Sequence, residues 1–91
     1  MDLKDIRAQI DVIDDALVQL FVKRMGLSAQ VADYKKANHM PIYVPARERE
    51  ILQDVATKAG PEMANYTRVL YSMLFELSRS YQSKLMDEDI G

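Results

Sequence analysis

Apolar residues recur at alternating intervals of three and four positions through the first third of the chain. The series is Leu3, Ile6, Ile10, Ile13, Leu17, Leu20, Leu27, Val31 and Tyr34. This spacing is typical of one face of an α-helix. Because no proline interrupts the series before Pro41, the pattern predicts one helix of about 35 residues, or ~50 Å at 1.5 Å per residue.

Two further helices are predicted beyond this point. Pro45 suits the first turn of a second helix, which ends before Gly60 and Pro61. Its predicted apolar face carries Glu48 one turn before Ile51, Leu52, Val55 and Ala59. A third helix follows Pro61, and its predicted inner face is Tyr66, Leu70, Met73, Leu74, Leu77, Tyr81 and Leu85. The acidic tail, residues 86–91, is predicted to fray.

These patterns predict an all-α fold with three helices, one of them very long, in a single domain over residues 1–91. A compact chain of this length has a radius of gyration of about 12 Å, so the long helix would project far beyond its own core. A small chain also buries only about 60–65% of the surface that its unfolded form exposes. We therefore expect the long helix to pack against a partner helix.

Composition narrows the classes of function. A formal net charge of −2 provides no global basic field, so we expect no nucleic-acid partner. The absence of cysteine excludes disulfides and thiolate chemistry, and the single histidine, His39, leaves a metal site without a ligand set, so we expect no metal. No apolar run approaches the ~18 residues of a membrane span. We expect a cytoplasmic protein with no membrane partner and no signal peptide.

Polar residues occupy helix positions where apolar residues would be expected. Arg24 interrupts the apolar series of the first helix, and Lys35 lies eleven residues later. That separation turns the helix to within about 20° of the same face and places the two cations ~16 Å apart along its axis. On the third helix, Ser78 and Gln82 share a face at i and i+4.

Each of these residues also has an ordinary structural interpretation. An arginine among apolar residues can extend to solvent, Lys35 can belong to a solvated helix face, and Ser78 and Gln82 can link helices by hydrogen bonds. Together with Arg47 and Glu48, however, they describe a pocket with several cations, one carboxylate and one amide. Such a site can hold a small dianion in one conformation and stabilise developing charge, but it has little equipment for covalent chemistry.

Four stretches occur in order along the three predicted helices. They are IRAQIDVIDDALVQLFVKR, which contains Arg7 and Arg24; VADYKK, which contains Lys35; PARERE; and ELSRSYQ. Together, over residues 3–84, they resemble the all-α, AroQ-class chorismate mutases. The resemblance implies an isomerase of the shikimate pathway that rearranges chorismate to prephenate without a cofactor, on the route to phenylalanine and tyrosine. It also implies an intertwined homodimer with antiparallel long helices and two shared sites.

The resemblance implies which residues bind the carboxylates of chorismate. Arg7 and Arg24 are similar to two arginines that grip them, and Arg47 is similar to a third cation that supports a ligand carboxylate and the neighbouring acid. Ser78 resembles a lesser carboxylate contact. Within one helix, Arg7 lies about 25 Å from Arg24 and roughly 100° around the axis, too far for both to contact one small ligand. Arg7 is therefore predicted to come from the other subunit.

The resemblance also implies contacts to the ether oxygen and the ring hydroxyl. Lys35 and Gln82 are similar to the pair that donates hydrogen bonds to the ether oxygen, and Glu48 is similar to the acid that accepts from the hydroxyl. Val44 stands where family members often carry an aspartate for the same hydroxyl, so its contribution would come from its backbone. Residues 49–50 are predicted to be a solvated pair.

Two other functions are compatible with the sequence. One is an isochorismate-pyruvate lyase on the same fold, which also needs a bound dianion and an ether-oxygen contact and is separated by product analysis. The other is a catalytically silent helical interaction module. Such a module would need no convergence of Arg24, Lys35, Glu48 and Gln82, and it would tolerate their joint replacement.

Overall fold

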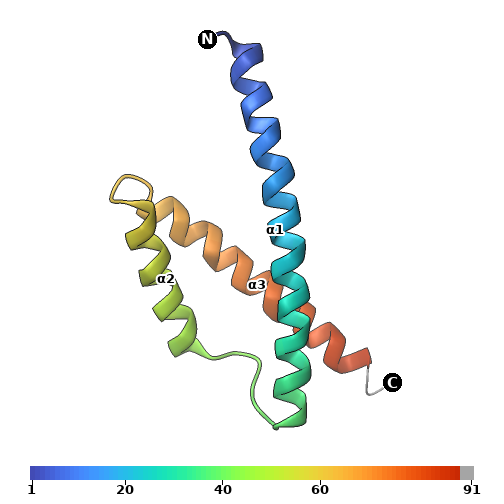
Figure 1. Cartoon of the computed structure of the whole chain (residues 1–91). Helices are drawn as coiled ribbons and strands as arrows, with labels where there is room; N and C mark the ends of the chain where they lie inside the picture. The colour runs from blue at the N-terminus through green and yellow to red at the C-terminus, as the bar shows by residue number, and fades with distance from the viewer. Residues whose placement is uncertain (89–91) are drawn as a thin grey trace.

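Three α-helices make up the fold of residues 1–88, the part of the chain that the computed structural model describes (Figure 1). They are α1 (Leu3–Ala37), α2 (Pro45–Ala59) and α3 (Ala64–Glu88). The predicted all-α class is confirmed, and so is the long first helix, which has 35 residues. α3 continues through residues 86–88, where fraying was predicted, and the rest of that predicted tail lies outside the described residues.

A tight hydrogen-bonded turn ends α1. The backbone N–H of Met40 donates to the carbonyl of Lys35 at 2.8 Å, and that of His39 donates to the carbonyl of Lys36 at 3.3 Å. These two bonds form a Schellman motif, whose turning residue adopts a left-handed conformation. His39 holds that conformation here, with φ of 53°. The turn redirects the connection 38–44 back toward the side chain of Lys35.

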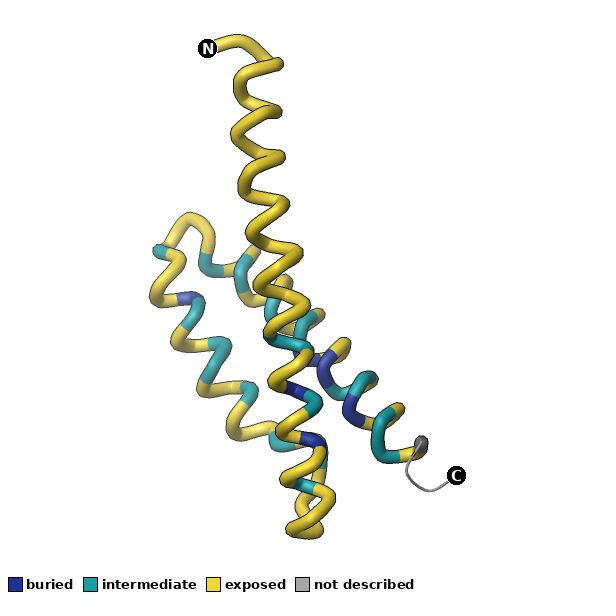
Figure 2. The backbone as a smooth tube through the Cα atoms, turned by 45° about the vertical axis from the view of Figure 1, so that its right-hand side comes forward, coloured by how far each residue is buried: buried dark blue, intermediate teal, exposed yellow. Residues whose placement is uncertain are grey.

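The chain is elongated because the N-terminal half of α1 extends past the other helices (Figure 1). Its radius of gyration is 16.4 Å and its extents are 54 × 28 × 14 Å, whereas a compact chain of this length would have a radius near 12 Å. α3 packs against both α1 and α2 and thereby connects them. Figure 2 shows that burial within α1 is confined to the part that lies near α3. None of the helices within residues 1–88 has the length and apolar character needed to cross a membrane.

The buried core is small and half polar. Its apolar members are Ala32, Ala56 and Phe75, and its polar members are Ser28, Ser78 and Gln82. Burying a polar side chain is unfavourable unless hydrogen bonds compensate for the lost water. The hydroxyls of Ser28 and Ser78 bond to each other, whereas the buried Oε1 atom of Gln82 has no partner within the described structure.

The predicted inner face of α3 is partly wrong. Leu74, Tyr81 and Leu85 are half-buried as predicted. The other four predicted residues are 41–72% exposed, namely Tyr66, Leu70, Met73 and Leu77. The packed face is turned by about 100° toward Tyr71 and Phe75, because α1 and α2 cover only one side of a helix whose apolar surface is wider than one stripe. On α2, the buried alanine is Ala56, and the predicted Ala59 is exposed.

Candidate active site

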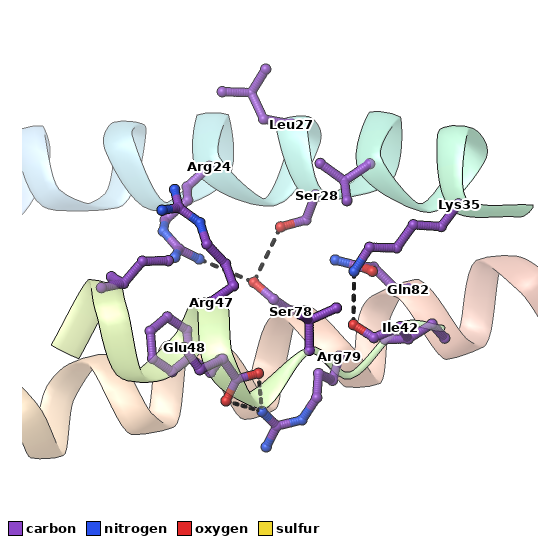
Figure 3. A pocket seen from close by; sticks show the side chains of 14 residues that line it. Arg24, Leu27, Ser28, Lys35, Ile42, Arg47, Glu48, Ser78, Arg79 and Gln82 are labelled. Carbon is purple, nitrogen blue, oxygen red and sulfur yellow. Dashed lines mark hydrogen bonds and ion pairs between the residues drawn. The ribbon is translucent and has the colours of Figure 1, made fainter. Parts of the chain in front are cut away.

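A cavity of about 430 Å³ lies where α3 meets α1, the start of α2 and the connection between them. This volume lies within the range of pockets that hold small organic ligands. The cavity is lined by Arg24, Leu27, Ser28, Val31, Lys35, Ile42, Val44, Arg47, Glu48, Ile51, Phe75, Ser78, Arg79 and Gln82. Figure 3 shows Arg24 and Lys35 toward opposite ends of the cavity, with Ser78 between them.

The structure brings together most of the residues that the sequence singled out. Those that line the cavity are Arg24, Lys35, Val44, Arg47, Glu48, Ser78 and Gln82. Arg7 is exposed on the projecting half of α1, away from the cavity. The geometric prediction that one chain cannot bring Arg7 to the same ligand as Arg24 agrees with this placement.

Arg24 turns inward from α1. Its Nη1 donates to the Ser78 hydroxyl at 3.1 Å, and the hydroxyls of Ser28 and Ser78 hydrogen-bond to each other at 3.1 Å. Its guanidinium carbon also lies 5.9 Å from the ring centres of Tyr71 and Phe75, within the range of cation–π attraction. These contacts hold a half-buried cation at one end of the cavity, where an anionic group can be bound.

Lys35 and Gln82 form the other end of the cavity. The Lys35 ammonium donates to the backbone carbonyl of Ile42 at 2.8 Å. Gln82 is 7% exposed, and its buried Oε1 atom has no hydrogen-bond partner within the described structure. An unpaired buried polar atom typically costs about 1–3 kcal/mol. A polar ligand at this end could therefore hydrogen-bond to N–H groups of Lys35 and Gln82 and to the unpaired oxygen of Gln82.

The acid of the cavity, Glu48, is held from α3. Arg79 Nη1 donates to both carboxylate oxygens of Glu48, and the Arg79 guanidinium lies 4.8 Å from the ring centre of Tyr43. The hydrogen bond to Glu48 is the main cause that raises the pKa of Arg79 above its usual value. The side chains of this pair are 31% and 22% exposed, so solvent screens it less than a surface pair.

Arg47 makes a more exposed pair at the cavity rim. Its Nη1 lies 2.9 Å from Glu50 Oε1, and the two side chains are 64% and 71% exposed. Arg47 was predicted to support the neighbouring acid, Glu48, but in this structure Arg79 takes that place. Arg49 and Glu50 are both exposed as predicted, although the partner of Glu50 is Arg47.

Sequence reasoning missed three polar contributors to the cavity. Arg79 lies three residues before Gln82, and Ser28 lies four residues after Arg24, so helical spacing from the predicted residues could have identified both. The third is the carbonyl oxygen of Ile42. A backbone acceptor carries no side-chain signature, and its position depends on the turn that ends α1.

The assembled site is suited to binding and electrostatic stabilisation. Four cations and one carboxylate line a cavity that also has apolar walls: Arg24, Lys35, Arg47, Arg79 and Glu48. Fixed charges and donors of this kind can orient a small anion and stabilise charge that develops during a reaction. Within residues 1–88, no group of three or more His, Cys, Asp or Glu side chains is placed to hold a metal ion.

Comparison with known proteins agrees with this chemistry. Residues 6–83 match the protein family described as chorismate mutase type II. The T-protein of Haemophilus influenzae is 49% identical over 61 residues, which cover 64% of this chain and 16% of that protein. The bifunctional chorismate mutase/prephenate dehydratase of Buchnera aphidicola is 33% identical over 89 residues, which cover 96% of this chain and 23% of that protein.

A third relative gives the same relationship at lower identity. The bifunctional chorismate mutase/prephenate dehydratase of Escherichia coli is 29% identical over 88 residues, or 94% of this chain and 23% of that protein. The chain thus spans between about a sixth and a quarter of the length of these relatives. Because the family match extends over most of all three helices, the chain belongs to the chorismate mutase type II family, the AroQ class that its sequence resembles.

Proposed function

We propose that this chain is a chorismate mutase, an isomerase that converts chorismate to prephenate in phenylalanine and tyrosine biosynthesis. The observation that carries the proposal is the convergence of Arg24, Lys35, Glu48 and Gln82, from three helices, on one cavity. Chorismate is a small dianion with an ether oxygen and a ring hydroxyl, and the cavity offers cations, an amide and a carboxylate. The reaction is a unimolecular [3,3] rearrangement, so positioning and electrostatics can supply the catalysis.

Arg24 would bind one substrate carboxylate, with Ser78 as a secondary contact. The guanidinium already lies in the cavity, held by the Ser78 hydroxyl at 3.1 Å. Arg47 has an exposed side chain at the rim and can exchange Glu50 for a ligand carboxylate, since exposed ion pairs contribute only about 0–1 kcal/mol. Holding both carboxylates would select the folded conformer in which the bond-forming carbons approach each other.

Lys35 and Gln82 would act on the ether oxygen. As its bond to carbon stretches, negative charge develops on this oxygen, so donors aimed at it act mainly in the transition state. The Lys35 ammonium now donates to the Ile42 carbonyl, and it carries further protons with which to reach a ligand. Gln82 is fixed by burial, so its amide needs little reorganisation during the reaction.

Glu48 would accept a hydrogen bond from the ring hydroxyl. The backbone of Val44 was expected to add a second contact, but its carbonyl already accepts from the backbone N–H groups of Arg47 at 3.1 Å and Glu48 at 3.3 Å, where α2 begins. Hydroxyl recognition therefore falls mainly to Glu48. The apolar Val44 side chain lines the same part of the cavity and adds a shape constraint.

The proposed active form is an intertwined homodimer in the cytoplasm, with Arg7 supplied by the second subunit. Apolar residues along the projecting half of α1 are exposed, among them Ile10 at 48%, Leu17 at 54% and Leu20 at 62%. Leu70 and Met73 on α3 are also more than half exposed. Such long apolar faces favour association with another chain, and an antiparallel partner helix would bring its own Arg7 toward this cavity.

The buried polar atoms favour a ligand-binding site over a silent interaction module. A module that only packs helices would gain stability from apolar residues in place of Ser28, Ser78 and Gln82.

Product identification tests the proposal. Purified protein should convert chorismate to prephenate and should release no salicylate from isochorismate. Salicylate release without prephenate formation would assign the chain to the lyases, and no reaction with either compound would favour the silent module.

A further inference from the structure

Glu48 poses an electrostatic difficulty for a site that receives a dianion. Among the described residues that line the cavity, it is the one acid. Its side chain is 22% exposed, so water screens its charge only partly. An uncompensated carboxylate at this position would repel the two carboxylates of the substrate. The residue that is needed to accept from a hydroxyl would then oppose binding of the same molecule.

Arg79 removes this difficulty in the structure. Its Nη1 donates to both oxygens of Glu48, so the carboxylate charge is compensated by a cation in direct contact. Arg24 and Lys35 make their hydrogen bonds to neutral oxygens, those of Ser78 and Ile42. Their charges therefore remain available to the dianion, while the charge of Arg79 is used within the protein.

The position of Arg79 is itself fixed from two sides. It lies on α3 immediately after Ser78 and one turn before Gln82, both of which are buried. Its guanidinium packs against the ring of Tyr43 at 4.8 Å, which belongs to the connection 38–44. In Figure 3 the Arg79 side chain reaches Glu48 from the side of the cavity opposite α1. The ion pair thus joins the start of α2 to α3 at the point where the hydroxyl would bind.

We propose that Arg79 is a positioning residue that compensates and orients Glu48, so that this carboxylate can accept from the hydroxyl of a dianionic substrate without repelling its carboxylates. This inference rests on the proposed function, from which the hydroxylated dianionic substrate is taken. Arg79 acts through Glu48 and makes no contact of its own with the reacting atoms.

A double-mutant cycle tests the proposal by steady-state kinetics with chorismate. Arg79→Gln removes the cation and keeps hydrogen-bond donors, and it should lower kcat/KM about tenfold or more, mainly through KM. Arg79→Lys keeps the charge and should stay within about threefold of the unmodified protein. In a Glu48→Gln background, where no charge needs compensation, Arg79→Gln should change kcat/KM less than about twofold.

Matched controls separate this role from a structural one. Arg68→Gln removes an exposed arginine of the same helix and should leave the kinetics unchanged. All variants should be folded and have the same oligomeric state, and variants that break the Glu48–Arg79 pair should unfold at a somewhat lower temperature because that pair joins α2 to α3. If Arg79→Gln does not fold, Arg79→Lys takes its place in the cycle. Glu48→Gln should then change kcat/KM by the same factor in the Arg79→Lys protein as in the unmodified protein, because both keep the cation.

The possible outcomes separate this inference from the function on which it rests. Unchanged kinetics of Arg79→Gln, or an equal loss whether Glu48 is present or replaced by glutamine, would overturn the role of Arg79 while leaving the mutase activity intact. If calorimetry and kinetics show that the unmodified protein neither binds nor converts chorismate, the proposed function fails and this inference fails with it.

Discussion

Gln82 is a buried polar residue whose side chain keeps an unpaired hydrogen-bond acceptor. It is 7% exposed, and its Oε1 atom lacks a hydrogen-bond partner within the described structure. Such an atom destabilises the empty protein. The ether oxygen of the proposed substrate can only accept, so it would use the amide N–H group of Gln82 and leave Oε1 unpaired. At functional sites, stability is often given up to keep a side chain that a ligand will use. Replacement of Gln82 by an apolar residue should therefore change stability and activity in opposite directions.

Gln82→Leu should stabilise the protein and inactivate it. Removing the unpaired oxygen should raise the free energy of unfolding by about 1–3 kcal/mol, whereas loss of an ether-oxygen donor should lower kcat about a hundredfold or more. Denaturant unfolding and chorismate turnover measure the two effects. Gln53→Leu, on the exposed face of α2, is the control and should change neither. A variant that is less stable yet fully active would contradict both assignments.

Site residues were predictable from the sequence where helical spacing fixed them. Arg24 and Lys35 were placed on one face by rotation alone, and both line the cavity. Ile42 was not predictable, because its contribution is a carbonyl whose position follows from the left-handed turn at His39. Arg79 was missed because a lone arginine on a helix usually extends to solvent, and its partner Glu48 lies 31 positions away in the sequence.

At the scale of elements, proline and glycine made the helix boundaries predictable. Pro45 begins α2, and Gly60, with φ of 87°, follows its end. Which face of α3 packs was less predictable, because its apolar surface is wide enough to serve two neighbours. The four exposed residues of the predicted inner face form a stripe beside the packed one. Periodicity alone identifies the apolar surface of a helix, but it does not say which partner covers each part.

His39→Gly should stabilise the turn that ends α1. The position requires a positive φ, which is 53° here, and glycine adopts this conformation without the steric cost of a Cβ atom. The expected gain is about 1 kcal/mol, visible as a rise of several degrees in Tm at a fixed protein concentration. His39→Ala is the control and should give no gain. Equal stability of the glycine and alanine variants would show that the turn is unstrained.

In the molecule as a whole, the radius of gyration is 16.4 Å and a long apolar face of α1 is exposed to solvent in a single chain. Within residues 1–88 of one chain, nothing covers the projecting half of α1, which Figure 2 shows as exposed throughout. The proposed dimer would bury this face and complete the site with Arg7.

Leu17→Glu should convert the dimer to a monomer and abolish turnover. The side chain is 54% exposed in one chain, so a charged residue at this position would stay in contact with water in a monomer. At a dimer interface the charge would be buried, which is unfavourable. Its neighbour Val18 is 62% exposed and points about 100° away. Val18→Glu should therefore leave the oligomer intact. Light scattering coupled to size-exclusion chromatography distinguishes the two, and an unchanged Leu17→Glu dimer would refute the interface.

Mixing two inactive variants tests whether each site is shared. Arg7→Ala and Lys35→Ala should each be inactive as pure homodimers. After subunit exchange, about half of the dimers are mixed, and each mixed dimer has one site with both residues intact, so about a quarter of the normal activity should return. If Arg7 acts within its own chain, or not at all, mixing will restore nothing beyond the sum of the parts.

Catalysis by this chain is tested by the ultraviolet absorbance of chorismate over time with the unmodified protein and with Lys35→Ala. With the unmodified protein, chorismate should be consumed and prephenate should appear. The folded Lys35→Ala variant should be slower by about a hundredfold or more, because it lacks the donor to the ether oxygen. A stable Lys35→Ala variant with near-normal turnover, or an unmodified dimer that leaves chorismate intact, would contradict the proposed mechanism.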